Sequence, residues 1–409
     1  MRLLKWISFV LAGLVVITLL GVLAIVWFVD PNSFKSRIES AVKDATGRDF
    51  VLVGDIELGF FPWLALRAGE GRFGNASGFG AEPMVTWKSA QLGARLFPLL
   101  RGELVADRVH LTGMEIRLVR RADGVANWQG IGGNKPADPN AKPMELRIDG
   151  IEIKDSRVSF VDETIPRHVE VTALNLTTDE IAPGEPLTGN EIAGVLHMDG
   201  FAPAGVPFRL AVPKAVLPKD YASIEVQEYS LRFGGFEAEG GVNGTFGAQP
   251  KLQGKIESNQ FDPRALLLSA GVAPPKTTDR DALGKVLLKA TWAFDAGAIN
   301  VDPFSLTVDD THFTGDFLRG AGVDPVGQFS LRGDAMNISR YVPPKDPNSE
   351  PFVLPTAMLK QLKFAGIITL DQATLDDIVM KGVTLRLILD EQGLRGVPRI
   401  PTKLPAGAP

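Results

Sequence analysis

The sequence predicts a mainly β protein. A single N-terminal transmembrane helix and a short amphipathic helix are followed by an extended antiparallel sheet with few helices. Beyond Phe50, apolar and polar residues alternate with a period of two, which is typical of strands with one buried face. The chain also contains 43 glycines and 29 prolines, which favour many turns between short strands. A long uncharged run near the N-terminus predicts a separate first element.

This first element is the apolar segment WISFVLAGLVVITLLGVLAIVWFV at residues 6–29. As a helix rising roughly 1.5 Å per residue, it is long enough to cross a hydrocarbon core of about 30 Å. Trp6 and Trp27 lie near its ends, where indole rings prefer the membrane interface, and Val29 closes it. A cleaved signal peptide would have a shorter apolar region followed by small residues. The sequence therefore predicts an uncleaved anchor, with residues 1–5 as a cytoplasmic stub and the body on the far side.

A short amphipathic helix is expected directly after the anchor. Asp30 and Pro31 supply an N-cap and a first-turn proline, and Thr46 with Gly47 supplies the stop. The apolar positions at helical spacing are Phe34, Ile38, Ala41, Val42 and Ala45. This stripe could lie on the membrane or cap the end of a sheet, and capping is the simpler interpretation.

The rest of the chain reads as strands divided by two proline-rich stretches. The expected parts are a β segment with its leading helix at 30–134, a linker at 135–143, a central β segment at 144–342, a proline-rich linker at 343–355, a C-terminal β segment at 356–397 and a disordered tail at 398–409. Helical interruptions are expected at residues 261–271 and 355–364.

Three segments share one sequence pattern, in which two short amphipathic strands flank a polar or glycine-containing turn. They are residues 103–118 (ELVADRVHLTGMEIRL), 145–160 (ELRIDGIEIKDSRVSF) and 366–387 (GIITLDQATLDDIVMKGVTLRL). Repetition of this unit predicts a sheet that grows in one direction and is apolar along one face. Helices, a second sheet, folding of the sheet on itself or an apolar ligand could cover that face.

Composition excludes several classes of function. The net charge of −5 and the absence of any long basic run leave no electrostatic footprint for nucleic acid. Without cysteine the chain has no disulfides, thiolate catalysis or cysteine-bound zinc. The four histidines are His110, His168, His197 and His312, and none is spaced from another as metal ligands are.

The remaining motifs also favour structural interpretations. Asp309-Asp310 and Asp376-Asp377 occur in turn-like contexts, so we expect solvated corners with diverging side chains and no acid–base pair. Residues 69–74 match G-x-G-x-x-G, but the sequence that follows is a poor helix former, and a dinucleotide site needs a helix there. The sequence therefore predicts no enzyme, no cofactor and no metal.

Several short motifs, taken in order, resemble one family. They are Asp30-Pro-Asn32, Ala45-Thr-Gly-Arg48, Gly54-Asp-Ile56, Phe61-Pro-Trp63, Phe97-Pro-Leu-Leu-Arg-Gly102, Asp123-Gly-Val-Ala-Asn-Trp128, Phe261-Asp-Pro-Arg264, Asp281-Ala-Leu283 and Met336-Asn-Ile-Ser-Arg-Tyr-Val-Pro-Pro344. Their order and spacing resemble the bacterial AsmA family over nearly the whole chain.

This resemblance implies a periplasmic body tethered to the inner membrane by one span, with the N-terminus in the cytoplasm. Members are similar to bridge-like lipid transfer proteins, in which a curled sheet forms a groove for acyl chains. The expected partners are a phospholipid or other acyl-chain lipid and the inner membrane. Larger members continue past the strand pair that ends here near Val397, so a continuous bridge between two membranes is not expected of this chain alone.

Two functional hypotheses follow. In the first, an apolar β groove handles phospholipid acyl chains during lipid transport and outer-membrane assembly. Its expected lining residues are Ile116, Leu118, Leu385 and Leu387, although for each residue taken singly ordinary sheet core is the favoured interpretation. In the alternative, the protein is a scaffold or regulator of outer-membrane protein assembly that binds other envelope proteins through its sheet edges.

Overall fold

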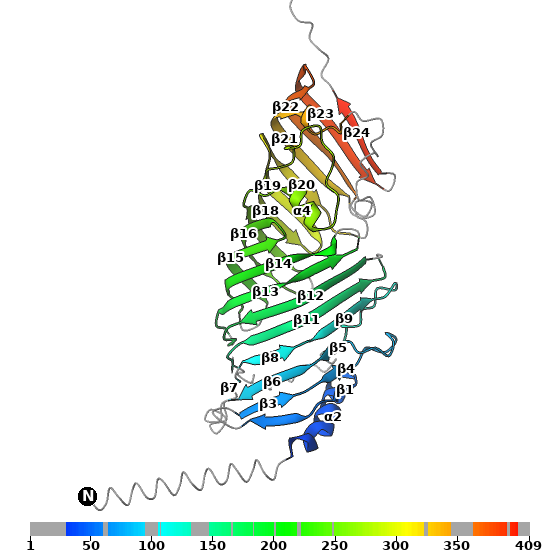
Figure 1. Ribbon diagram of the computed structural model, residues 1–409, viewed down its shortest axis with the longest axis vertical. Helices are drawn as coiled ribbons and strands as arrows, with labels where there is room; N and C mark the ends of the chain where they lie inside the picture. The colour runs from blue at the N-terminus through cyan, green and yellow to red at the C-terminus, as the bar shows by residue number, and fades with distance from the viewer. Residues whose placement is uncertain are drawn as a thin grey trace, which may run out of the picture. The chain divides into compact units, whose positions relative to one another are not determined.

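The computed structural model describes most of the chain after the expected anchor (Figure 1). The described residues are 30–59, 64–94, 105–106, 108–131, 147–164, 167–182, 184–199, 202–218, 222–247, 249–322, 326–344, 363–390 and 393–399. The predicted stub at 1–5, the anchor with Trp6, Trp27 and Val29, and the linker at 135–143 lie outside these ranges. Within them, no helix is both long enough and apolar enough to cross a membrane.

The chain divides into an amino-terminal unit, Met1–Ser156, and a carboxy-terminal unit, Arg157–Pro409. The fold is mainly β, as predicted. The helices are η1 (Pro31–Phe34), α2 (Lys35–Thr46), α4 (Pro263–Ser269) and η2 (Ile338–Arg340). The strands that begin in the amino-terminal unit are β1 (Phe50–Leu52), β2 (Ile56–Gly59), β3 (Leu64–Ala68), β4 (Gly71–Phe73), β5 (Val85–Trp87), β6 (Ser89–Ala94), β7 (Val105–Ala106), β8 (Val109–Thr112), β9 (Glu115–Arg120), β10 (Arg147–Ile148) and β11 (Ile151–Asp162).

The leading helix covers the first edge of the amino-terminal sheet. Asp30 caps η1 by accepting a hydrogen bond from the Asn32 backbone N–H, and α2 ends at Gly47 with a φ of 70°. Asn32 Oδ1 then accepts the Ile56 N–H, and Glu39 Oε1 accepts the Leu52 N–H, each at 2.9 Å. Polar side chains therefore bond the edge of the sheet. The predicted apolar stripe does not cap it, because Phe34, Ala41 and Ala45 are exposed and no α2 residue is fully buried.

The short strands of the amino-terminal unit are parts of longer strands that bend at the same level. β2 pairs with β3 and β3 with β6, while β1 pairs with β4 and β4 with β5 on the other side of the bend. Hydrogen bonds cross the bend from Gly54 N to Glu70 O and from Gly113 N to Lys154 O. A Cβ on Gly54 would lie 2.5 Å from the Glu70 nitrogen, so only glycine permits this close approach. The aligned bends curl the sheet.

The first two copies of the sequence repeat lie side by side in this unit. β7 pairs in parallel with β10, with Val105 opposite Arg147, and β8 pairs in parallel with β11, with Val109 opposite Ile151. Parallel neighbours need a long connection, which residues 113–146 supply. The third copy, residues 366–387, differs because its two strands pair with each other as an antiparallel hairpin.

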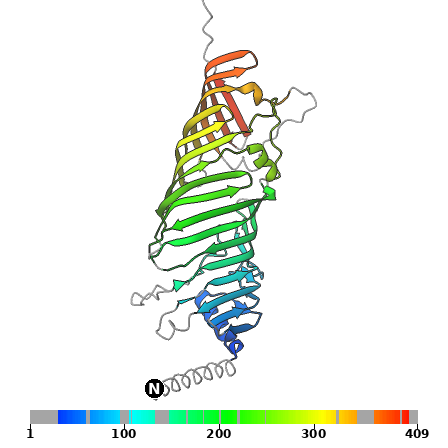
Figure 2. The same cartoon turned by 60° about the vertical axis from the view of Figure 1, so that its left-hand side comes forward.

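The carboxy-terminal unit contains longer strands, mostly in antiparallel order (Figure 2). They are β12 (Arg167–Thr178), β13 (Leu187–Met198), β14 (Ala202–Ala215), β15 (Ser223–Phe233), β16 (Phe236–Thr245), β17 (Lys251–Ser258), β18 (Val286–Asp295), β19 (Ala298–Val308), β20 (Thr311–Arg319), β21 (Gly327–Asn337), β22 (Phe364–Leu375), β23 (Ile378–Asp390) and β24 (Gly393–Arg399). Each strand pairs with the next from β12 to β24.

One pairing in this unit departs from the predicted antiparallel order, as β7 with β10 and β8 with β11 do in the amino-terminal unit. β21 and β22 are parallel, with Gly327 opposite Phe364, because the chain returns across the sheet between them. The helix predicted at 261–271 is confirmed as α4, capped by the Asp262 side chain on the N–H groups of Arg264 and Ala265. Residues 355–362 of the helix predicted at 355–364 lie outside the described residues; Lys363 is not helical, and Phe364 begins β22. β24 extends to Arg399, two positions into the expected tail.

Candidate functional site: the apolar face of the carboxy-terminal sheet

One face of the carboxy-terminal sheet carries uncharged ladders of directly paired residues, and we call it the apolar face. The first ladder runs from β15 to β23 through Tyr229, Gly240, Ile256, Ala290, Phe304, Gly315, Leu331, Ile368 and Leu385. The second crosses the same strands through Val226, Val242, Gly254, Trp292, Val301, Phe317, Phe329, Gly366 and Leu387. Neither ladder contains a charged residue.

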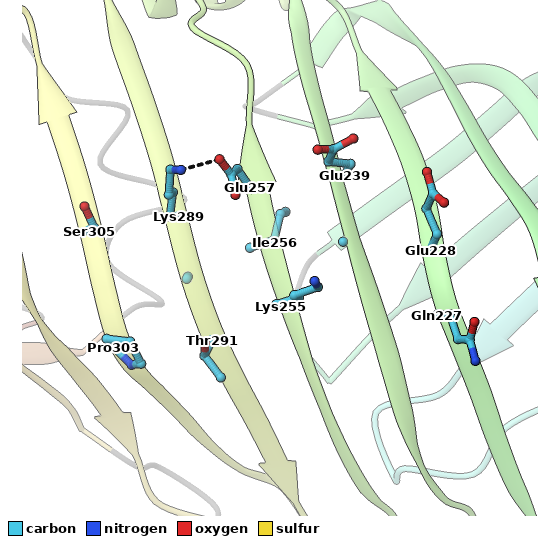
Figure 3. Close-up of a pocket in the computed structure, with 12 residues that line it drawn as sticks. Gln227, Glu228, Glu239, Lys255, Ile256, Glu257, Lys289, Thr291, Pro303 and Ser305 are labelled. Carbon is cyan, nitrogen blue, oxygen red and sulfur yellow. Dashed lines mark ion pairs between the residues drawn. The ribbon is translucent and has the colours of Figure 1, made fainter.

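The opposite face is charged. A ladder on that face crosses the same strands through Ser230, Glu239, Glu257, Lys289, Ser305, Thr314, Arg332, Thr369 and Thr384. Figure 3 shows part of this row, in which Lys289 forms an ion pair with Glu257. Successive strand residues point to opposite faces, so one sheet separates a charged surface from an apolar one.

Bulges shape the sheet at the level of these ladders. The register shifts between Val226 and Tyr229 in β15 and between Val301 and Phe304 in β19. Between these two strands the charged face is hollowed by about 560 Å³, lined among others by Gln227, Glu239, Lys255, Lys289 and Pro303 (Figure 3). Each bulge bends its strand, so the curvature of the sheet changes between β15 and β19.

Residues 259–285, which we call the cap, cover part of the apolar face. Ala270, at the end of α4, is 1% exposed and packs with Ala202 and Val206 of β14. Phe261 makes an edge contact with Phe236 of β16, with ring centroids 5.0 Å apart. The cap therefore leaves the sheet after β17 and packs back over earlier strands before β18 begins.

The other end of the cap is fastened through Asp309. Its carboxylate accepts the backbone N–H groups of Leu283, Gly284 and Lys285 at 2.8 to 3.1 Å, and the Tyr341 hydroxyl at 2.7 Å. Burial opposes ionisation of Asp309, but these hydrogen bonds prevail and lower its pKa. Burial, together with the Asp309 carboxylate, raises the pKa of Tyr341.

A second fastening involves Arg340. Its guanidinium contacts Asp279 of the cap at 2.7 Å and Asp310 at 2.9 Å. Asp309 and Asp310 diverge as predicted, and Asp310 is solvated. The prediction of a solvated corner is wrong for Asp309, because residues far away in the sequence fold over it. Asp376, by contrast, is an exposed turn residue with a φ of 51°, as is typical of a corner.

Burial is uneven across the apolar face. A cluster beside the strand ends that the cap adjoins contains Phe313, Leu370 and Val383, which are 7%, 7% and 8% exposed. The second ladder lies further along the strands, and its Trp292, Phe317 and Phe329 are only half-buried. We call this second ladder, from Val226 to Leu387, the open ladder.

The four residues that the sequence suggested for groove lining fall in two places. Leu385 and Leu387 lie on the apolar face, at the β23 ends of the two ladders, and both are half-buried. Ile116 and Leu118 lie in β9 of the amino-terminal unit, where Ile116 pairs with Val85, and both are also half-buried. The structure thus brings together Leu385 and Leu387 but assigns the other two to a separate unit.

Sequence reasoning missed the aromatic residues of the open ladder. Trp292, Phe317 and Phe329 come from three strands, and their alignment depends on the registers of the strands between them. Alternation within each strand indicates the face, but no local pattern indicates which residues of different strands meet.

Polar clusters elsewhere in the described residues have structural partners. His110 Nδ1 contacts Glu152 Oε2 at 2.6 Å, and His197 Nε2 contacts the Thr172 hydroxyl at 3.1 Å. No group of three or more acidic or histidine side chains in the described part of the chain is arranged to hold a metal ion. At residues 69–74 a turn leads into β4, where Gly71 packs under the Trp87 ring.

A comparison with protein-family models gives one match, to the AsmA family over residues 1–232. The chain belongs to the AsmA family. The match covers the amino-terminal unit and ends within β15 of the carboxy-terminal unit. No curated protein and no solved structure matches the chain.

Two AsmA motif residues hold the amino-terminal unit together. Arg48 is 5% exposed, donates to the Gln129 carbonyl at 2.9 Å and lies over the Phe73 ring. Asn127 is fully buried; its side chain accepts the Val119 N–H and donates to the Arg117 carbonyl and to Asn75 Oδ1. These motifs therefore stabilise the fold, and the uncharged ladders are the stronger candidate for a functional surface.

Proposed function

We propose that this AsmA-family protein carries acyl-chain lipid on the apolar face of its carboxy-terminal sheet, without catalysing a reaction. The observation that carries the proposal is the open ladder, in which uncharged residues, among them Trp292, Phe317 and Phe329, remain half-buried from β16 to β23. An uncharged, elongated surface favours an uncharged, elongated ligand, because a polar ligand would lose hydration there without gaining hydrogen bonds.

The dimensions of the ladder suit an acyl chain. Eight inter-strand steps separate β15 from β23, and at roughly 4.8 Å per step the ladder is about 38 Å long. Half of a membrane hydrocarbon core of about 30 Å is about 15 Å, which is the depth occupied by the lipid tails of one leaflet. The ladder therefore exceeds one lipid tail and gives it room to move along the sheet.

The energetics require only apolar contact. Burying one methylene is worth about 0.8 kcal/mol, so some twenty methylenes offset roughly 16 kcal/mol of exposure to water. The head group can remain in water at the edge of the face. The charged opposite face keeps the carrier soluble, and the two faces together explain why the alternation is so regular from β15 to β23.

We further propose that residues 6–29 anchor the protein in the bacterial inner membrane, with the N-terminus in the cytoplasm and the body in the periplasm. The uncharged length of that segment and AsmA-family membership support this location. In this setting the protein contributes to lipid transport and outer-membrane biogenesis.

Site-specific photocrosslinking in cells tests the lipid proposal. A benzophenone amino acid is placed at Trp292, on the open ladder, and in a matched variant at Thr291, the adjacent exposed residue on the charged face. After irradiation, the purified full chain is examined by mass spectrometry for phospholipid adducts. We expect adducts at position 292 and at least tenfold fewer at position 291. Equal labelling at the two positions, or none at 292 in a folded protein, would overturn the proposal.

The second candidate function is a scaffold for envelope proteins. It is favoured by β24, which pairs with β23 on one side and with no strand on the other among the described residues. An exposed strand edge invites pairing with another chain. Protein adducts from benzophenone at Arg395 in β24, together with no lipid adducts at Trp292, would support this role over lipid transport.

A further inference from the structure

Glycines on the apolar face lie directly opposite aromatic residues of the neighbouring strand. The pairs include Gly366 with Phe329, Gly254 with Trp292, Gly333 with Phe313 and Gly240 with Tyr229. A Cβ on Gly366 or Gly333 would meet the aromatic ring first, whereas a Cβ on Gly254 or Gly240 would meet a backbone carbonyl oxygen first and an atom of the aromatic side chain at 2.8 or 2.7 Å.

Gly366 shows the arrangement most clearly. A Cβ built on it would lie 2.5 Å from both Cε1 and Cγ of Phe329, so the ring covers the glycine backbone. Real Cβ atoms essentially never approach so closely, and any larger residue at this position must displace the ring. Gly327 is covered similarly by Phe317, with a Cβ position 2.8 Å from Cε2.

An aromatic ring over a glycine stabilises a sheet by shielding its backbone from water, which explains such a pair in any sheet. That explanation is sufficient for Gly333 and Phe313, because Phe313 is packed in the buried cluster beside the cap. The open ladder, whose aromatic rings are half-buried, has three such glycines in it or beside it: Gly254, Gly327 and Gly366. On an open face, a ring that lies along the backbone also projects less than one that stands away from it.

We infer that the pairs Gly254–Trp292, Gly327–Phe317 and Gly366–Phe329 set the depth of the lipid-binding surface. The inference rests on the proposed function, and it names the positions that determine which ligands fit. Rings lying over glycines leave a low, smooth floor along which a flexible acyl chain can lie and slide. A larger residue in place of Gly327 or Gly366, where the ring is the nearest neighbour, lifts the ring into the path of that chain.

The test substitutes Gly366→Ala in the full chain, with Gly320→Ala as the matched control. Neither glycine requires a positive φ, and a Cβ at Gly320 meets no atom within 4 Å. Bound phospholipid per protein is measured by mass spectrometry after gentle purification, and circular dichroism reports folding. We expect Gly366→Ala to lower bound lipid at least threefold and Gly320→Ala to leave it unchanged.

A double variant separates ring displacement from a general structural defect. Gly366→Ala with Phe329→Ala has no ring to lift, so it should bind at least twofold more lipid than Gly366→Ala alone. Gly327→Ala, with and without Phe317→Ala, repeats the comparison if Gly366→Ala does not fold. Normal lipid content in the folded glycine variants, or failure of the double variants to recover, would overturn the inference while the proposed function stands. An unsubstituted chain without lipid would instead overturn the proposed function.

Discussion

Two parts of the same sheet face have similar residues but different surroundings. Phe313 in β20 belongs to the cluster beside the cap and is 7% exposed, whereas Phe317, four residues along the same strand, is half-buried in the open ladder. Both are phenylalanines on the apolar face, and the ring of each lies against a glycine, Phe313 against Gly333 and Phe317 against Gly327. The comparison teaches that composition makes a residue suitable for burial, but the path of the connecting segments decides whether it is buried.

This difference predicts a division between residues that stabilise the fold and residues that bind the proposed lipid. Residues beside the cap contribute to folding, because their apolar surface is removed from water within the chain itself. Residues of the open ladder retain apolar surface that a ligand can cover. The substitutions below test this division, from the largest expected effect to the smallest.

The largest effect is expected from placing a charge in the buried cluster. Phe313→Asp should cost more than about 4 kcal/mol of unfolding free energy and abolish cooperative unfolding, because the carboxylate has no partner there. Phe317→Asp should leave the protein folded, with bound lipid reduced several-fold. Circular dichroism and lipid mass spectrometry measure the two outcomes. If both variants unfold equally, the open ladder is ordinary core.

Truncating leucines gives a milder form of the same comparison. Leu370→Ala, in the buried cluster, should destabilise the fold by about 2–5 kcal/mol, because it leaves a cavity. Leu387→Ala, at the end of the open ladder, should cost roughly half as much, because water or lipid can fill the space. Denaturant unfolding of the purified chain measures both free energies, and equal values would contradict the division.

The fastening of the cap can be weakened without altering the ladders. Asp309→Ala removes the acceptor of three backbone N–H groups and the Tyr341 hydroxyl, and should cost about 1–3 kcal/mol. Hydrogen exchange at the Leu283 and Gly284 amides should accelerate. Asp310→Ala removes an exposed carboxylate and its ion pair with Arg340 but no hydrogen bond to these amides, so it is the control and should leave them protected. Unchanged exchange in Asp309→Ala would mean that other contacts hold the cap.

Acid should weaken the same fastening. The pKa of Asp309 is lower in the folded than in the unfolded chain, so its contribution to stability is present above the unfolded value of about 3.9 and is lost as the pH falls through the lower folded value. Exchange of the Leu283 and Gly284 amides, corrected for the intrinsic pH dependence of exchange, should therefore accelerate below about pH 4. Asp309→Asn should abolish this additional dependence; if the dependence persists, it arises from another group.

The smallest effect is expected on the charged face. Lys289→Ala breaks an ion pair with Glu257 in which both side chains are about half exposed, so it should change stability by about 0–1 kcal/mol. Bound lipid should not change. Trp292→Ala, from the same strand but on the open ladder, should lower bound lipid clearly, as lipid mass spectrometry can establish. A loss of lipid in Lys289→Ala would implicate the charged face in binding.

Much of the fold could be predicted because its signals are local. Alternation in β9 and β23 indicated the face of Ile116, Leu118, Leu385 and Leu387, and capping residues located α2 and α4. The parallel pairing of β21 with β22 could not be predicted in this way. It depends on a chain return across the sheet, and no residue of either strand carries a signal for its direction.

The sequence by itself determined that the chain forms amphipathic strands, where its leading helix begins and ends, and to which family it belongs. These features depend on residue periodicity and on side chains within a few positions of each other. Only the tertiary structure decided which apolar residues are covered. That outcome depends on contacts such as Ala270 with Val206 and Asp309 with Leu283, which join segments far apart in the sequence. Local alternation is the same on either side of the boundary between the buried cluster and the open ladder, so it carries no information about where the cap lies.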